Sequence, residues 1–344
     1  MIHQNQTSKI VMDDSKTLIP GAPEKKPKRP AAAKRPPREP KCPRFDRFCR
    51  GAENDWQPAD EIEENFRHGH WRARRVKVMA ALARSGTGRV TCQHFACCGS
   101  DAMVQWSPKL KKHRISANYC KNRHCEPCMR AKAGKIAGNL RRRLEEGNHL
   151  SYRFLTLTLK HSKSALGDQI KRLYRAFRKM RSMDLWKINQ RGGVFAVEVK
   201  WDARSREWHP HLHVICEGDH MSRERLSAAW LACTGDSFVV DIRILASGRD
   251  AAHYVSKYVA KGTSGEVWDD LDAASEWITA TRGLRMCASF GSWRGLKLTA
   301  KSEDPGDWVS VGFLNQITTK AIAGEIWARG VLENLRPPGA TDSS

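Results

Sequence analysis

The feature that most constrains the fold is a regular exchange of strand-like and helix-like segments between residues 152 and 261. Runs rich in apolar and β-branched residues, such as RFLTLTLK (153–160) and SFVVDIRIL (237–245), predict buried strands. After the first run, an amphipathic helix is predicted by apolar residues that recur every three or four positions: Leu166, Ile170, Leu173, Phe177 and Met180.

A hairpin is predicted in the middle of this region. GVFAVEVKW (193–201) and WHPHLHVIC (208–216) are separated by the polar turn DARSRE, and a second helix is expected in SRERLSAAWLACTG. The resulting order is β-α-β-β-α-β-α. It predicts an α+β fold in which an antiparallel sheet of the split βαβ type carries its helices on one face.

The charge of the chain indicates a polyanionic partner. The formal net charge is +23 and the sequence pI is about 9.8, and each phosphate neutralised by Lys or Arg releases condensed counterions. No apolar run of about 18 residues is present, and the first residues, MIHQNQTSKIVMDDSK, do not follow the layout of a signal peptide. We therefore expect a cytoplasmic protein that binds nucleic acid and no membrane.

Composition divides the rest of the chain. Residues 1–60 combine proline with basic residues, as in PEKKPKRPAAAKRPPREPK, and we expect a disordered tail. Residues 61–150 are helical in pattern and rich in cysteine, and residues 266–344 are expected to form a helical accessory region. The region between them, residues 151–265, holds the predicted sheet.

Cysteine spacing predicts a structural zinc site in residues 61–150. The segments FACCGS and YCKNRHCEPCMRA supply four thiolates from two short stretches, which suits a tetrahedral Zn²⁺. The preferred ligands are Cys98, Cys120, Cys125 and Cys128. Cys97 and Cys92 are alternates, His94 and His124 compete with them, and free buried cysteines are the other interpretation.

A basic helix is predicted directly after the cysteines, in RAKAGKIAGNLRRRLEEGNH. It is a candidate for gripping duplex DNA, although basic residues on a helix are usually only a solvated face. The candidate DNA-binding residues are Arg130, Lys132, Lys135, Arg141 and Arg142.

Histidines alternate along the predicted strand WHPHLHV. His209, His211 and His213 point to one face of an extended strand, so they can share one metal ion. Glu198 is a charged residue within the apolar VFAVEV, where a carboxylate is costly unless it is paired or bound to metal. His211, His213 and Glu198, with His209 competing for the third place, suit a catalytic Mg²⁺ or Mn²⁺. Three exposed surface histidines are the alternative.

The stretch YVSKYVAK contains a tyrosine followed three residues later by a lysine, and this pair is repeated after four residues. On a helix, Tyr254 and Tyr258 share one face and Lys257 and Lys261 lie beside them. A phenol is a weak nucleophile at neutral pH, and the lysines offer positive charge that would ease deprotonation or neutralise a phosphate. Alone, such a helix is more often an ordinary surface helix.

Taken together, three blocks resemble the rolling-circle replication initiators of the HUH endonuclease superfamily. FLTLTLKH (154–161) is similar to the first motif of that family, and WHPHLHV (208–214) to its metal-binding motif, with His211 and His213 as the ligands. YVSKYVAK (254–261) is similar to the tyrosine motif in its two-tyrosine form. The blocks span about a third of the chain, within residues 151–265.

The resemblance implies a metal-dependent nickase that cleaves one DNA strand at a plasmid or phage origin. A tyrosine would stay joined to the 5′ phosphate and leave a 3′ hydroxyl that primes synthesis; Tyr258 ranks as the first nucleophile and Tyr254 as its partner. Expected partners are single-stranded and origin DNA, a host helicase and DNA polymerase. No GxxxxGK[ST] motif is present, so unwinding is left to the host.

Two other functions compete with this interpretation. A rolling-circle transposase combines the same histidine strand, tyrosine helix and zinc module, and its substrate cannot be distinguished from these residues. A DNA-binding regulator that has lost catalysis would keep the fold alone, and the presence of every expected nucleophile and ligand argues against it.

Overall fold

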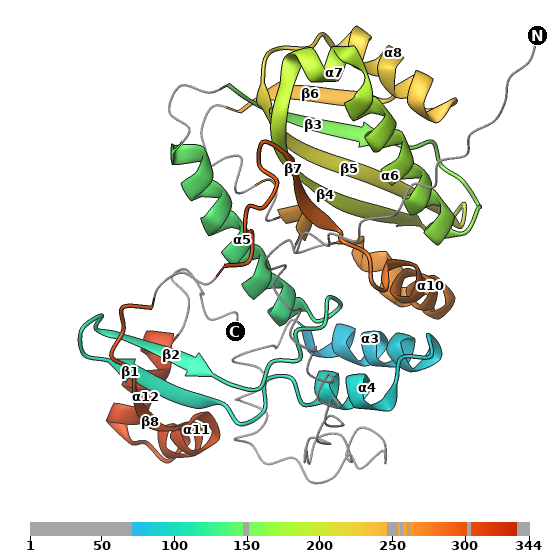
Figure 1. Cartoon of the computed structure of the whole chain (residues 1–344). Coiled ribbons are helices and arrows are strands. Elements are labelled where there is room, and N and C mark those ends of the chain that lie inside the picture. The colour runs from blue at the N-terminus through green and yellow to red at the C-terminus, as the bar shows by residue number, and fades with distance from the viewer. Residues whose placement is uncertain are drawn as a thin grey trace, which may run out of the picture. The chain divides into compact units, whose positions relative to one another are not determined.

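The computed structural model describes residues 71–146, 151–245, 254, 257–259, 262–300 and 304–335. The predicted basic tail (1–60) and Lys261 lie outside these residues. The described part is α+β and contains two antiparallel sheets (Figure 1).

The larger sheet has five strands in the spatial order β6-β3-β5-β4-β7, and every neighbouring pair is antiparallel. The predicted hairpin is confirmed as β4 and β5, which pair over their whole length. Glycine at position 193 is required there, because a Cβ would meet the carbonyl oxygen of Ile215 at 2.0 Å. The strand bounds are β3 Tyr152–Thr158, β4 Gln190–Asp202, β5 Glu207–Gly218, β6 Val240–Ile244 and β7 Cys287–Gly291.

One face of this sheet is covered by four helices, of which the sequence predicts all but the short α7. The apolar stripe of α6 is buried, and acidic Asp168 in its first turn and basic Arg181 in its last complement the helix dipole. Ser222 caps α8 by accepting a hydrogen bond from the backbone N–H of Arg225, and Gly235 ends it at φ 86°. These helices are α6 (Leu166–Ser182), α7 (Asp184–Asn189), α8 (Arg223–Thr234) and α10 (Leu271–Thr281), which the 3₁₀ helix η2 (Gly265–Asp269) precedes.

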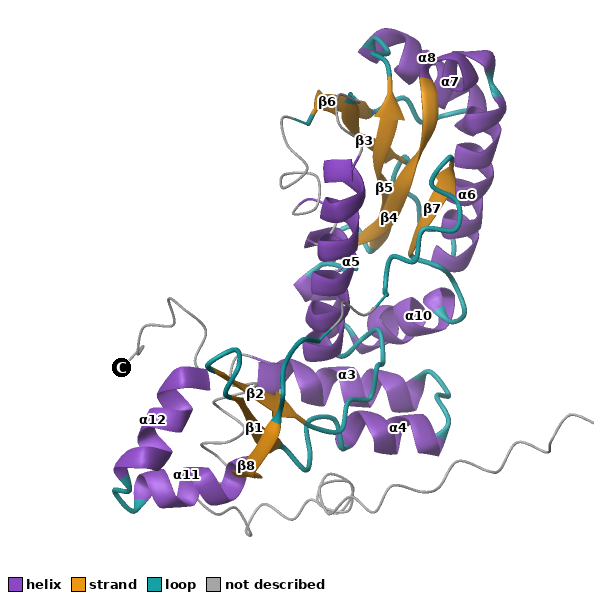
Figure 2. Ribbon diagram, turned by 60° about the vertical axis from the view of Figure 1, so that its left-hand side comes forward, coloured by secondary structure: helices purple, strands orange, loops and turns teal. Residues whose placement is uncertain are grey.

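The opposite face is covered by α5 (Glu126–Glu146), as Figure 2 shows. Its buried stripe packs with apolar side chains of the sheet: Ala133, Ile136, Leu140 and Leu144 contact the group that includes Phe154, Val194 and Ile215. The prediction of helices on one face is therefore wrong. A narrow apolar stripe among many basic residues gave no sign that α5 would be buried against a sheet.

Further elements precede and follow the sheet. The helices α3 (Arg72–Arg84) and α4 (Arg89–Ala96) pack together, and α3 also contacts α10. A second sheet has the strand order β2-β1-β8. The helices α11 and α12 share a small apolar core with it. The bounds are β1 Met103–Ser107, β2 Lys112–Ser116, β8 Val309–Phe313, α11 Leu314–Ile322 and α12 Ile326–Leu335.

Four strands fall in regions that were expected to be helical. β1 and β2 lie within residues 61–150, while β7 and β8 lie within residues 266–344. Each is only five residues long, so its alternation is too short to be recognised, and β7 and β8 pair with strands that are distant in sequence. No helix among the described residues is long and apolar enough to cross a membrane.

Candidate active site

The histidines lie on β5, the central strand of the larger sheet. Across one ladder His211 is paired with Thr158 and His213 with Thr156, and across the other Glu198 is paired with His211. Directly paired residues share a face of the sheet. The predicted ligands and the two threonines therefore stand together on the face that α5 covers.

Each histidine ring is oriented by a threonine of β3. The Oγ1 atom of Thr158 lies 3.1 Å from Nδ1 of His211, and that of Thr156 lies 3.2 Å from Nδ1 of His213. A hydrogen bond at one ring nitrogen fixes the orientation of the other. Both Nε2 atoms are consequently left to face the site.

Glu198 meets His213 between β4 and β5. Its Oε2 atom lies 3.1 Å from Nε2 of His213, and the two residues are 9% and 4% exposed. Burial raises the pKa of the carboxyl group, but the hydrogen bond and charge of His213 and the charge of Lys200 outweigh it and lower the pKa overall. Glu198 is therefore ionised at neutral pH, as a cation ligand must be.

His211 carries a buried nitrogen without a partner. Its Nε2 atom makes no hydrogen bond within the described residues. Burial, with the nearby charges of His209 and Lys200, lowers its pKa to about 3, so the ring is neutral. An unpartnered nitrogen on a buried neutral imidazole is suited to metal ligation, and the donor set of two imidazoles and a carboxylate fits a divalent cation.

His209 lies farther along the same face. Its ring centroid is 4.3 Å from that of His211 and 3.7 Å from that of His161, and its cross-strand partner is Lys200. Burial and the charge of His161 lower its pKa to about 4. Its contacts are thus with other basic residues, whereas Glu198 bonds directly to a predicted ligand.

Both tyrosines pack over the histidine face. Tyr258 stacks on His213 with ring centroids 3.4 Å apart and ring planes at 12°. Tyr254 stacks on Phe154 at 4.9 Å, and Phe154 also stacks on Tyr258 at 6.1 Å. Tyr254 and residues 257–259, here called the tyrosine segment, have helical backbone. The two rings therefore share one helix face beside the histidines.

Lysine does not lower the pKa of Tyr258. Burial, Glu198 and Tyr254 raise it above the ordinary value of a phenol, while Arg243 opposes them. The ammonium of Lys257 lies 5.9 Å from the centroid of the Tyr258 ring. The role of Lys257 in easing deprotonation or neutralising a phosphate therefore stays a prediction, and Lys261 is not among the described residues.

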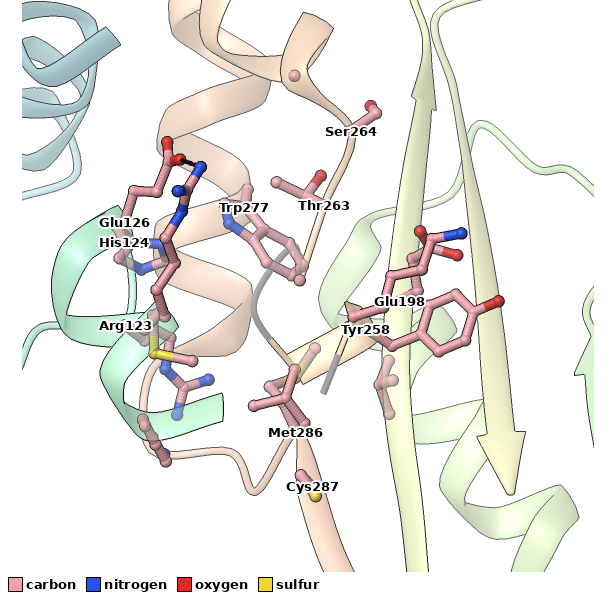
Figure 3. A pocket seen from close by; sticks show the side chains of 18 of the residues that line it. Arg123, His124, Glu126, Glu198, Tyr258, Thr263, Ser264, Trp277, Met286 and Cys287 are labelled. Atoms are coloured by element: carbon pink, nitrogen blue, oxygen red, sulfur yellow. Dashed lines mark hydrogen bonds and ion pairs between the residues drawn. The ribbon is translucent and has the colours of Figure 1, made fainter. Parts of the chain in front are cut away.

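A cavity of about 830 Å³ adjoins Glu198 and Tyr258. Figure 3 shows these two side chains on one side and Arg123, His124 and Glu126 on the other, with Thr263 and Trp277 between them. The histidine site thus opens toward a space large enough for a ligand.

The four preferred cysteines come together from separate elements. Cys98 follows α4, Cys120 follows β2, Cys125 precedes α5 and Cys128 lies in its first turn. The Sγ atom of Cys98 is 3.6 Å from that of Cys125 and 3.5 Å from that of Cys128, and Cys120 is 3.7 Å from Cys128. A zinc ion with Zn–S bonds of about 2.3 Å places tetrahedral thiolates about 3.8 Å apart. The cluster can therefore hold a metal such as zinc.

The alternates lie outside this cluster. The four thiols lie within 4.8 Å of one another, and within the described residues no other group of three or more donors does so. Cys97 and Cys92 are buried but do not belong to the group. His94 is exposed, and His124 packs edge-on against Trp268 and Trp277. The backbone N–H of Asn122 approaches Sγ of Cys120 at 3.4 Å, which suits a thiolate.

The basic candidates on α5 are all exposed. Its apolar stripe faces the sheet, and of the candidates Arg130 and Lys132 also line the cavity. Arg130 pairs with Glu126 and Arg141 with Glu145, both four residues apart. The candidates without a carboxylate partner among the described residues are Lys132, Lys135 and Arg142.

Sequence reasoning missed two groups of residues at this site. Thr156 and Thr158 occur in FLTLTLK, and their alternation on one strand was a usable signal. Thr263, Trp268 and Trp277 line the cavity but carry no local pattern, because the folding of residues 262–287 back onto β4 is not encoded in their spacing.

Comparisons with known proteins agree on one family. A sequence model described as replication protein matches residues 111–311. The chain is 25% identical over 178 residues to a protein rep of Bacillus amyloliquefaciens, covering 48% of this chain and 52% of that protein. It is 28% identical over 151 residues to a protein rep of a Bacillus species, covering 42% of this chain and 48% of that protein. It is 27% identical over 149 residues to a protein rep of Staphylococcus aureus, covering 39% of this chain and 65% of that protein.

The chain spans about half the length of the first two relatives. No solved structure matches it significantly. The family match covers more than half of the chain and includes the three blocks at 154–161, 208–214 and 254–261. With the histidines, the carboxylate and the tyrosines gathered on one face of the sheet, it follows that the chain belongs to the replication-protein family, as its resemblance to rolling-circle replication initiators predicts.

Proposed function

We propose that this chain is a two-tyrosine rolling-circle replication initiator of the HUH type, which nicks one strand at an origin and later rejoins it. The observation that carries the proposal is the stacking of Tyr258 on His213 at 3.4 Å, beside the unpartnered Nε2 of His211. Family membership favours an initiator over a transposase. The gathered nucleophiles and ligands favour an enzyme over a regulator without catalysis.

The topology of the larger sheet supports an HUH core. Its elements follow the chain order β3-α6-β4-β5-α8-β6, with α7 between α6 and β4, and the strands lie in the order β6-β3-β5-β4. That arrangement supports the split βαβ type predicted from the sequence. It puts the histidines on an inner strand, where neighbours on both sides fix their positions.

Mg²⁺ or Mn²⁺ would be held by His211, His213 and Glu198, and His209 is the alternative to Glu198 as third ligand. Such a cation supplies a Lewis acid that polarises the scissile phosphate. The chain's own contribution is to keep the His211 imidazole neutral by burial and the Glu198 carboxylate ionised. The threonines of β3 hold the rings in the orientation that ligation needs.

Tyr258 is the first nucleophile in this proposal. Its phenol gives its proton to water, Oη bonds to phosphorus, and the P–O3′ bond breaks, so that the departing 3′ oxygen takes a proton from water. The products are a 5′-phosphotyrosine and a 3′ hydroxyl that primes synthesis. Attack of a 3′ hydroxyl on the phosphotyrosine reverses the step and rejoins the strand. Lys257, with Lys261, would offset charge on the phosphate.

Tyr254 is the second nucleophile. Its ring follows Phe154 and Tyr258 in one stack and lies one helix turn away from Tyr258. It would cleave the regenerated origin while Tyr258 still holds the first end. Tyr258 is placed first because it alone of the two stacks on a predicted metal ligand.

The remaining parts have supporting roles. Zinc bound by Cys98, Cys120, Cys125 and Cys128 would fix the start of α5, whose exposed basic residues would contact duplex DNA next to the nick. A host helicase and DNA polymerase would act on the exposed 3′ end. The division into a zinc module (61–150), a nickase (151–265) and an accessory region (266–344) remains a prediction.

The test is a covalent adduct between the chain and labelled single-stranded origin DNA in Mn²⁺. We expect the adduct with the wild type, its persistence in Tyr254→Phe and its loss in Tyr258→Phe. Tyr119→Phe, at an exposed tyrosine outside the site, is the matched control and should form the adduct normally. No adduct with the wild type would refute the nickase, and an adduct that survives Tyr258→Phe but not Tyr254→Phe would reverse the ranking.

A further inference from the structure

The cavity beside Tyr258 extends from the residues of the proposed cleavage to segments that the cleavage does not use. Its walls are β4, the tyrosine segment, residues 262–268, α10, residues 284–287 and the turn that carries Cys125 and Cys128. At about 830 Å³ it lies within the range of ligand pockets. Figure 3 shows it reaching from Glu198 to the turn at Arg123 and His124.

The charges around the cavity favour an anion. Glu126 is already paired with Arg74 and Arg130. The guanidinium of Arg123 bonds to backbone carbonyls. Four further lining cations form no ion pair with any described carboxylate: Lys132, Lys200, Lys257 and Arg285. The cavity therefore has spare positive charge, and its other acidic lining residue is the proposed metal ligand Glu198.

Aromatic rings favour a flat ligand. Trp268 is partly exposed and lines the cavity, with the His124 ring 5.9 Å away and edge-on to it. Trp277 also packs edge-on against His124, with the ring centroids 6.2 Å apart. Aromatic faces within a cationic groove are the features by which proteins hold single-stranded nucleic acid, because every base has a face that can stack.

Thr263 provides an independent sign of a ligand. It is 7% exposed and lines the cavity, and its Oγ1 has no hydrogen-bond partner among the described residues. Its backbone is held by a parallel bridge to Val199 of β4. A buried hydroxyl without a partner costs free energy, and a hydroxyl can either donate to or accept from the edge of a base.

We infer that the cavity holds one unstacked nucleotide of the single strand, next to the scissile phosphate. Trp268 stacks on the base, Thr263 bonds to its edge, and the spare cations hold the adjoining phosphates. The pocket would give the nickase part of its sequence preference, and it would make the cysteine turn a wall of the substrate site. This inference rests on the proposed function, because it takes the bound strand as substrate.

The experiment measures binding without cleavage. The protein is the full chain with Tyr254→Phe and Tyr258→Phe, which keep both rings. The probe is a fluorescent single-stranded 12-mer enriched by binding from a random pool, and each base is removed in turn to leave an abasic site. In the otherwise unchanged chain, we expect one position at which base removal weakens binding roughly 5- to 100-fold, as loss of one stacked base does.

The decisive comparison adds Trp268→Ala. At that one position the penalty for base removal should vanish, while penalties elsewhere stay the same. Trp268→Phe should restore most of it, and Thr263→Val should weaken the base preference at the same position about tenfold or less. Trp327→Ala, at a half-exposed tryptophan of α12 that does not line the cavity, is the control and should change nothing.

Two outcomes would overturn the inference. One is that removing a base weakens binding to the Trp268→Ala variant as much as it weakens binding to the parent, at every position. The other is that a free deoxynucleoside triphosphate displaces the 12-mer at micromolar concentration, which would show a mononucleotide site. Failure of the nickase is a separate result: the coupling between Trp268 and one base can be present even if the chain with both tyrosines forms no adduct.

Discussion

The two candidate metal sites differ in how completely the protein closes them. The four thiols lie within 4.8 Å of one another and come from separate segments of the chain. The histidine site has one nitrogen without a partner, one carboxylate and an adjoining cavity. A structural zinc site is saturated by protein ligands, whereas a catalytic site keeps positions open for substrate. The contrast supports the proposal that the thiols hold a structural metal and that the histidines hold a catalytic one.

The two sites also differ in how firmly the backbone around them holds the ligands without metal. The histidines stand on a central strand between two neighbours, so the sheet would keep them in place without metal. The cysteines bridge the end of α4, a loop and the start of α5, so metal binding and local folding should be coupled there. Removing a ligand should therefore cost stability at one site and activity at the other.

The largest effect is expected from Cys125→Ser. Cys125 is 1% exposed within the cluster, and loss of a thiolate should release zinc, whose binding in small modules contributes on the order of 10 kcal/mol to folding. We expect the metal content by atomic emission to fall from about one zinc per chain to near zero and the thermal midpoint to drop sharply. Cys233→Ser, at a partly buried cysteine outside the cluster, is the control. Unchanged zinc in Cys125→Ser would remove the structural assignment.

His211→Ala should leave the fold intact and impair cleavage. Losing one of two imidazole ligands is expected to slow adduct formation roughly 100-fold or more, since a metal Lewis acid is worth several kcal/mol. The zinc content and thermal midpoint should stay near those of the wild type. Partial recovery at high Mn²⁺ would identify a ligand role. A large loss of zinc in this variant would break the contrast between the sites.

The stability of the histidine site should depend on pH. The pKa of His211 is about 3 in the folded chain and about 6.5 when unfolded. Because the unfolded chain then binds more protons, the free energy of unfolding falls as pH falls from 6.5 toward 3. At pH 5 the loss relative to pH 7 is about 2 kcal/mol for this residue. His211→Gln should flatten that acid limb in urea unfolding without added Mg²⁺, while exposed His94→Gln should not.

Much of the candidate site was predictable because its signals are local. Alternation places His211 and His213 on one face wherever the strand lies, and a carboxylate inside VFAVEV marks Glu198. The CxxC spacing of Cys125 and Cys128 likewise places two ligands on one turn. The antiparallel hairpin of β4 and β5 then followed from two strands joined by a short polar turn.

The parts that were missed depend on long-range packing. β7 pairs with the edge of β4, although it lies nearly a hundred positions later in the sequence. The helix α5, from an earlier region, covers the sheet face on which the histidines lie. The raised pKa of Tyr258 likewise could not be predicted, because burial and Glu198 act on it from other elements. Spacing carries no information about these contacts.

The smallest effect is expected from Thr158→Val, which tests how the open site is supported. Valine has nearly the same shape as threonine but cannot bond to Nδ1 of His211, which now lies 3.1 Å from Oγ1. Loss of such a supporting bond typically lowers metal affinity 10- to 100-fold, so about ten times more Mn²⁺ should be needed for half-maximal adduct formation, with the rate at saturating Mn²⁺ nearly unchanged. Thr234→Val, whose hydroxyl bonds within α8 and its following turn, controls for the loss of a buried threonine hydroxyl elsewhere. An unchanged Mn²⁺ requirement would mean that β5 alone orients His211, and that the open site is held by the strand and not by its neighbours.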